Sequence, residues 1–207
     1  MKSKENKNGK GKYIAIFALL LVPFISIFLI IQYRHIFAPT NDEIIDYILE
    51  SEGYKSNVEY TVINSKGEFK EDVEMYYKKQ YGFRVEFPEE RVKIYKDGYI
   101  SIIENDYEYE LNEGFDTLYP LGFISNILKN EITEVKEGTE EWGDIKYLEF
   151  CINLSSKNKH LSKAKVYINK EDKSPIVTKI YNSDGEESVI IVYDDFSYLD
   201  NIDKNLF

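Results

Sequence analysis

The stretch that decides the fold reads Met75-Tyr-Tyr-Lys-Lys-Gln-Tyr-Gly-Phe-Arg-Val-Glu-Phe-Pro88, and it is soon followed by Val92-Lys-Ile-Tyr-Lys-Asp-Gly98. Apolar and polar side chains alternate from Tyr81 to Phe87, which is typical of a strand with one buried face. Pro88 ends this strand because proline cannot donate to a strand ladder. Asp97-Gly98 favours a tight hairpin turn. The stretch therefore predicts antiparallel hairpins.

The same period of two recurs on both sides of this stretch. Further half-buried strands are expected at 57–62, 73–77, 99–103, 107–111, 145–154, 164–169, 176–181 and 189–193. Ser65-Lys-Gly67 and Asn182-Ser-Asp-Gly185 are typical turns between them. We expect roughly nine to eleven strands with short connections, and a sheet of that size tends to curl.

Two short helices interrupt the strand pattern. The first follows Thr40, which forms a capping box with Glu43, and the second follows Pro120, a residue that suits a first helical turn. Each helix carries one apolar face, which needs a sheet to cover. The predicted fold is therefore mainly β (α+β): a curved antiparallel open β-barrel or half-barrel covered by short helices. The helix-face residues expected to contact a partner or ligand are Ile44, Ile48, Phe123 and Ile127.

A long apolar segment precedes this domain. Residues 13–33 hold no charge, and as a helix they would be roughly 31 Å long, which matches a bilayer core. A cleaved secretory signal is the alternative, but the run is long and no small-residue cleavage site follows it. We expect a cytoplasmic basic tail at 1–12, a single-pass signal anchor at 13–33, a linker at 34–39 and an extracytoplasmic domain at 40–207. Tyr13, Tyr33 and Arg34 are expected at the membrane interface.

The charge of the chain limits its partners. Of 26 basic and 37 acidic residues, six basic and one acidic lie at or before Arg34, which leaves a formal charge of −16 for the rest. Such a domain repels nucleic acid and anionic lipid headgroups. Basic proteins, cations or neutral groups are the polar partners that fit. Cys151 is the only cysteine, so no internal disulfide can form.

The candidates for catalysis and metal binding are few, and we predict no catalytic residue, metal or cofactor. His35 lies beside the apolar segment and His160 lies in a polar loop, neither next to a nucleophile motif. Cys151 has acidic neighbours, which disfavour a thiolate. The acidic turn at 182–187 lacks the full ligand series of a calcium loop. Adjacent acid pairs point to opposite faces of a strand, so a hydrolase would need carboxylates from distant strands.

The stretch 75–98, with the capped helix before it and the helix near Pro120, resembles the LolA/RseB-type lipoprotein-carrier fold. More narrowly, residues 40–198 are similar to the GerS-related spore-germination proteins. That family implies an open β-barrel or half-barrel without catalytic residues. It also implies a role in binding and supporting a cortex-modifying amidase. Known members are lipoproteins, whereas this chain has no lipobox cysteine and uses residues 13–33 instead.

Two functions remain open after the resemblance. The first is a membrane-anchored, non-catalytic accessory protein of sporulation or germination that supports a cell-wall-modifying enzyme by protein binding. The second is a carrier or sensor that binds a lipid or lipoprotein on the apolar concave face of the sheet.

Overall fold

The computed structural model describes residues 8–37, 39–105, 107–139 and 145–207; within 8–37 it describes the side chains of 13, 17 and 19–33 only. The chain separates into two compact units, Met1–Thr40 and Asn41–Phe207.

The first unit contains helix α1 (Asn8–Phe37), which is 30 residues long and has Pro23 inside it. The side chains of residues 19–33 are all exposed. The helix extends beyond the predicted span at both ends and includes part of the segment expected as a linker. Among the residues described, the structure contains no helix with the length and apolarity needed to cross a membrane. The helix is thus confirmed as secondary structure, and the transmembrane part of the predicted fold is not shown.

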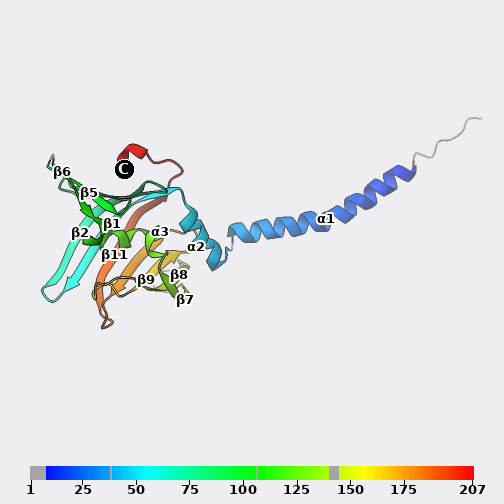
Figure 1. Ribbon diagram of the computed structural model, residues 1–207. Coiled ribbons are helices and arrows are strands. Elements are labelled where there is room, and N and C mark those ends of the chain that lie inside the picture. Colours follow the sequence, from blue (N-terminus) through cyan, green and yellow to red (C-terminus); the bar gives the residue numbers. More distant parts are fainter. Residues whose placement is uncertain (1–7, 38, 106, 140–144) are drawn as a thin grey trace, which may run out of the picture. The chain divides into compact units, whose positions relative to one another are not determined.

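The second unit contains one antiparallel sheet of eleven strands in the described residues (Figure 1), within the predicted range of nine to eleven. The strands are β1 (Gly53–Asn64), β2 (Gly67–Lys78), β3 (Gly82–Glu86), β4 (Val92–Lys96), β5 (Tyr99–Glu104), β6 (Tyr107–Asn112), β7 (Glu131–Gly138), β8 (Tyr147–Asn153), β9 (Lys163–Asn169), β10 (Pro175–Tyr181) and β11 (Glu187–Tyr198). The tight connections depend on local turn residues; at the predicted hairpin, for example, Asp97 has φ 51° and Gly98 has φ 84°.

The strand order is β6-β5-β4-β3-β2-β1-β11-β10-β9-β8-β7. Two meanders are therefore joined by one pairing between distant parts of the chain, in which Val58 lies opposite Tyr193 and Tyr60 lies opposite Ile191. In the part of the chain that the structure describes, β6 and β7 end the sheet and each pairs with a single neighbour. The sheet is consequently open rather than a closed barrel.

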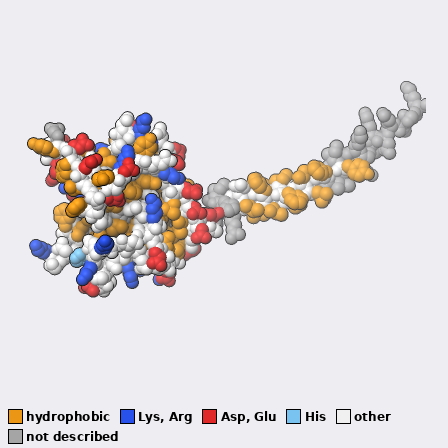
Figure 2. Space-filling view, in the orientation of Figure 1, with side chains coloured by type: hydrophobic (Ala, Val, Ile, Leu, Met, Phe, Trp, Pro, Cys, Tyr) orange, Lys and Arg blue, Asp and Glu red, His pale blue; other side chains and the backbone are white. Residues whose placement is uncertain are grey.

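The predicted first helix is α2 (Asn41–Glu50), whose buried residues are Ile44 and Ile48. Its acidic side chains form part of an acidic surface over α2 in Figure 2. The single helix expected at 120–128 is wrong. The chain instead forms a 3-10 turn, η2 (Tyr119–Gly122), and then one short helical turn, α3 (Ile124–Ile127). Buried residues of α2, α3 and the strands make one core cluster.

Candidate functional site: the crossing segment and the open end of the sheet

The connection from β6 to β7 must traverse the whole sheet, because these strands lie at its two ends. We name residues 113–130 the crossing segment; it contains η1 (Glu113–Phe115), η2 and α3. Figure 1 shows α3 lying over the middle of the sheet. Seven residues of the segment are buried against the sheet: Pro120, Gly122, Phe123, Ile124, Ser125, Ile127 and Leu128. The chain therefore covers its own concave face.

Gly122 shows how closely the crossing segment packs on the sheet. A Cβ atom at this position would lie 2.0 Å from Tyr60 Oη, 2.9 Å from Tyr60 Cζ and 3.2 Å from Met75 Cε. Tyr60 and Met75 are themselves buried on β1 and β2. Only a residue without a side chain fits here, so the space between segment and sheet is filled at this point.

Three tyrosine hydroxyls from the central strands hold the crossing segment by hydrogen bonds. Tyr60 Oη donates to the Tyr119 carbonyl and Tyr193 Oη donates to the Gly122 carbonyl, both at 2.9 Å. Tyr54 Oη lies 2.9 Å from Ser125 Oγ. Burial raises the pKa of all three phenols. They therefore remain neutral hydrogen-bonding groups at physiological pH, as buried polar groups require.

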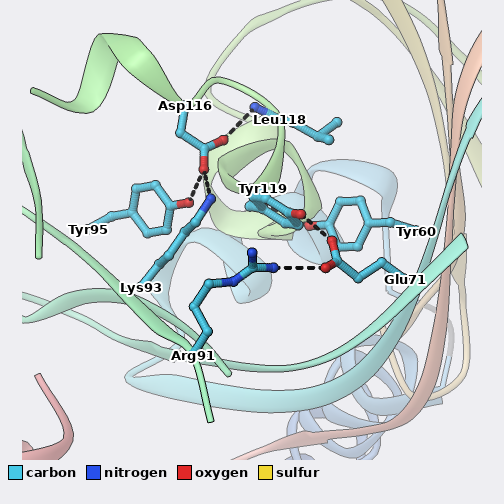
Figure 3. Close-up of polar contacts among 8 residues, drawn as sticks. All are labelled: Tyr60, Glu71, Arg91, Lys93, Tyr95, Asp116, Leu118 and Tyr119. Carbon is cyan, nitrogen blue, oxygen red and sulfur yellow. Dashed lines mark hydrogen bonds and ion pairs between the residues drawn. The ribbon is translucent and has the colours of Figure 1, made fainter. Parts of the chain in front are cut away.

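A polar cluster lies where the crossing segment leaves β6 (Figure 3). Lys93 on β4 forms an ion pair with Asp116 on the crossing segment, and both side chains are mostly buried. Tyr95 Oη donates to the same Asp116 oxygen at 2.8 Å. Burial raises the pKa of Tyr95, and the charge of Asp116 raises it further. Asp116 thus joins the segment to the neighbouring strand.

A second ion pair completes the cluster on β2. Arg91 Nη2 lies 2.8 Å from Glu71 Oε1, and the other carboxylate oxygen of Glu71 accepts a hydrogen bond from Tyr119 Oη. The Arg91 guanidinium also lies 3.9 Å from the centre of the Phe87 ring, which is a cation–π distance. The two acidic and two basic side chains neutralise one another, so the cluster has a structural role: it holds the crossing segment on the sheet.

The periodicity of the sequence does not reveal this cluster. Lys93 and Tyr95 pair with Val85 and Phe83 on β3, so they share the core-facing side of the sheet. The apolar residues Val92 and Ile94 are only half-buried. The one local sign of the cluster is that Lys93 and Tyr95 alternate with apolar residues in the same strand. The residues that complete the cluster come from three other segments of the chain, so this sign alone does not identify them.

An open groove of about 1040 Å³ lies along the crossing segment. Residues of η1 and η2 line one part of it, and residues 154–158, between β8 and β9, line another. Its polar walls consist largely of neutral amides and hydroxyls: Asn112, Thr117, Asn126, Asn130, Ser155, Ser156 and Asn158. With Phe115, Pro120, Leu121 and Leu154 also in its lining, the groove is of mixed polarity.

The open end of the sheet at β6 is unusual, because all six residues of this strand are exposed. The prediction that this strand is half-buried is wrong. Tyr109 and Leu111 lie opposite the buried Ile102 and Ile100 of β5, so they continue the core-facing side beyond the crossing segment. Tyr107 and Phe115 add further exposed aromatic surface. Exposed apolar side chains that are neighbours on one side of a strand, as those of Tyr109 and Leu111 are, are typical of interaction sites.

The four predicted interface residues lie in the core. Ile44, Ile48, Phe123 and Ile127 have no exposed surface and contribute to the cluster between helices and sheet. Their part in a partner or ligand interface stays a prediction. Of the residues expected at a membrane interface, Tyr13 and Tyr33 are exposed on α1, and the Arg34 side chain lies outside the described residues.

Cysteine and histidine, the chemically reactive residue types, do not form part of the polar cluster. Burial raises the pKa of the Cys151 thiol, and the Glu149 carboxylate 3.6 Å from Sγ raises it further. His160 is exposed in the β8–β9 connection, and His35 has no described side chain. No group of three or more His, Cys, Asp or Glu side chains in the described part of the chain could hold a metal ion.

Comparisons with known proteins show a similar fold and a family. A solved structure described as an uncharacterized conserved protein from Thermus thermophilus has a similar fold: the TM-score is 0.52 and the identity 12%, over 80% of this chain and 91% of that chain. The family described as "Sporulation protein YdcC-like" matches residues 12–207. The chain belongs to this family, which confirms the expected link to sporulation.

Two further solved structures have lower TM-scores. One is a LolA superfamily protein of Nitrosomonas europaea, with a TM-score of 0.46 and 11% identity over 81% of this chain and 97% of that chain. The other comes from the Clostridioides difficile complex of the CwlD amidase with the GerS lipoprotein, with a TM-score of 0.46 and 22% identity over 77% and 96%. No curated protein matches the sequence significantly.

Proposed function

We propose that this chain is a membrane-anchored, non-catalytic accessory protein of sporulation that acts by binding a protein partner. The observation that carries the proposal is the contrast between the two parts of the core-facing side of the sheet. Its middle is filled by the chain's own crossing segment, and its end at β6 exposes aromatic and aliphatic side chains. Membership of a sporulation-protein family supplies the biological setting.

A cell-wall-modifying enzyme, such as a cortex amidase, is the partner we propose. This choice follows the sequence resemblance to GerS-related proteins. The acidic charge of the domain favours a partner with a basic surface. The reactive residues support a non-catalytic role, since the Cys151 thiolate is disfavoured and His160 lies in an exposed loop.

The membrane placement rests on the sequence. Residues 13–33 carry no charge, and the five lysines before them favour a cytoplasmic N-terminus. The domain from residue 40 would then lie outside the cytoplasm. Thiol labelling tests this topology in a Cys151→Ser background. A membrane-impermeant maleimide should label Ser183→Cys, in an exposed turn, on intact cells; it should label Ser3→Cys only after lysis. The reverse pattern would refute the orientation.

Affinity capture tests the binding role. Tagged full-length protein, solubilised from sporulating cells, should retain a cell-wall-modifying enzyme in roughly equimolar amount. A variant with Tyr107→Ser and Phe115→Ser should lose it, because both side chains are more than two thirds exposed and their loss leaves the core unchanged. An Asp46→Asn variant, changed at an exposed position of α2, is the control.

The alternative function, binding of an apolar ligand on the concave face, has a distinct outcome in the same experiment. A lipid carrier should co-purify with about one lipid per chain, extracted by organic solvent and identified by mass spectrometry. Recovery of stoichiometric lipid without a protein partner would overturn the proposal.

A further inference from the structure

The two ends of the sheet differ in how they are protected against a further strand. The unpaired backbone groups of an edge strand can bind another strand, and many proteins prevent this with lysine, proline or a β-bulge in the edge strand. β7 has such features: its pairing with β8 is irregular between Ile132 and Glu134, and Lys136 lies on it. β6 pairs with β5 in continuous register and contains neither lysine nor proline.

The hydrogen-bond register shows which backbone groups of β6 are free to pair. The Glu113 N–H donates to the Gly98 carbonyl at 2.9 Å, one position beyond the pair of Tyr99 and Asn112. Since bonding direction alternates along an antiparallel strand, Leu111, Tyr109 and Tyr107 direct their backbone groups toward β5. Glu108, Glu110 and Asn112 direct theirs toward the open edge.

The side chains of β6 define what an added strand would have to carry. On the core-facing side, Tyr107, Tyr109 and Leu111 are 75%, 45% and 38% exposed, which calls for apolar partners. On the other side Glu108 and Glu110 are exposed. Figure 2 shows hydrophobic and acidic side chains gathered at this corner of the domain.

The same charges disfavour a second copy of this chain. Two antiparallel registers of β6 with itself overlap most fully and bring its free backbone groups together, and they place Glu110 opposite Glu110 or opposite Glu108. Like charges directly opposite each other destabilise a strand pair. A strand that presents lysine or arginine at these positions would be stabilised instead.

We propose that β6 is a strand-addition site for an extended protein segment in which basic residues alternate with apolar ones. The partner's basic side chains pair with Glu108 and Glu110, and its apolar side chains cover Tyr107, Tyr109 and Leu111. Main-chain hydrogen bonds to residues 108, 110 and 112 supply affinity, as in other cases of β-strand addition. This inference rests on the proposed function, because it names the surface and the chemistry of the partner.

The test uses the full-length chain in mild detergent and a synthetic fluorescent peptide in which lysine alternates with valine and tyrosine. Fluorescence anisotropy should show saturable binding that weakens with added salt, because exposed charge pairs are screened. The same peptide with glutamate in place of lysine should bind at least tenfold more weakly. Equal binding of the two peptides would overturn the charge assignment.

Two variants at residue 110 distinguish the contribution of the backbone hydrogen bond from the contribution of the side-chain charge to peptide binding. Glu110→Pro removes an N–H that faces the edge and leaves the bonds to β5 intact, so it should weaken binding at least tenfold. Glu110→Gln keeps the N–H and removes one charge, so a two- to fivefold loss is expected. Asp46→Asn on α2 makes the same change in net charge and should bind as the wild type. Binding to Glu110→Pro with unchanged affinity would overturn the proposal.

Hydrogen exchange provides a measurement that does not depend on a variant's folding. In the unaltered chain, the lysine peptide should slow exchange at the amides of residues 108, 110 and 112. If it leaves them unchanged, or if sedimentation shows a dimer that Glu110→Pro abolishes, β6 does not serve a basic partner. Retention of a sporulation partner by Glu110→Pro would refute this site and leave the proposed function standing.

Discussion

Replacing Gly122 by alanine is the sharpest test of the packing between the crossing segment and the sheet. The new Cβ would overlap Tyr60 Oη at 2.0 Å and Tyr60 Cζ at 2.9 Å. Met75 Cε, at 3.2 Å, limits a shift of the Cβ away from the tyrosine. Tyr60 is almost completely buried, so its ring can move only by displacing core residues. Overpacking of a well-packed core costs about 1–3 kcal/mol. We expect the upper half of that range, because two of the contacts are far inside van der Waals distance.

Thermal unfolding of the full-length chain, followed by far-ultraviolet circular dichroism, measures this effect. For a domain of this size, about 1 kcal/mol corresponds to roughly 2–4 °C, so Gly122→Ala should lower Tm by roughly 4–12 °C. Gly114→Ala is the control in the same segment, since its Cβ would meet only the end of the exposed Asn112 side chain at 3.1 Å. Its stability should change by no more than about 0.5 kcal/mol.

A double mutant identifies the atom responsible. Tyr60→Phe removes the hydroxyl that lies nearest to the new Cβ; alone it should cost about 1 kcal/mol through the lost hydrogen bond to the Tyr119 carbonyl. Gly122→Ala should then cost less in the Tyr60→Phe background than in the wild type. If Gly122→Ala leaves Tm unchanged in the wild type, space exists beneath the crossing segment and the reasoning is refuted.

Three further predictions concern ionisable groups. Asp116→Ala should lower the free energy of unfolding in urea by about 3 kcal/mol, because it leaves the mostly buried Lys93 without its ion-pair partner. Adding Lys93→Met to this variant should recover part of the loss. If the losses of the two substitutions simply add, the ion pair does not stabilise the fold. Cys151 should react slowly with iodoacetamide at neutral pH, and Glu149→Gln should speed the reaction by lowering the thiol pKa; no change would exclude Glu149 as a cause. Burial raises the pKa of Tyr54, Tyr60 and Tyr95, so their contribution to stability is complete below about pH 10 and is lost as pH rises, because only the unfolded chain ionises. The final part of the tyrosinate absorbance should therefore appear together with unfolding, and complete ionisation of the tyrosines in the folded protein would contradict this.

The meanders were predictable because their signals are local. Alternation identified nearly every strand, and Asp97-Gly98 placed a hairpin where φ is positive at both residues. The pairing of β1 with β11 joins residues more than 120 positions apart, and no local signal specifies such a partner. The open form of the sheet depends on that pairing, so sequence reasoning could suggest a half-barrel without deriving its strand order.

The candidate site was less predictable, for reasons visible in particular residues. Pro120 and the apolar residues after it favour one helix, but Phe123 has an extended backbone (ψ 110°) between η2 and α3, so the helix is interrupted there. Tyr107, Tyr109 and Leu111 alternate like any half-buried strand, and only the position of β6 at the end of the sheet leaves them exposed. Burial depends on what lies over a strand, which periodicity does not report.

Hydrogen–deuterium exchange of the unliganded full-length protein tests most directly whether the chain fills its own concave face and leaves β6 free. The amides of Ile127 and Leu128, bonded to the carbonyls of Phe123 and Ile124, should exchange as slowly as those of β1 and β11. The edge-facing amides of residues 108, 110 and 112 should exchange fastest within the sheet. Rapid exchange throughout α3, as in a mobile lid over a ligand cavity, together with a protected β6 would contradict the account.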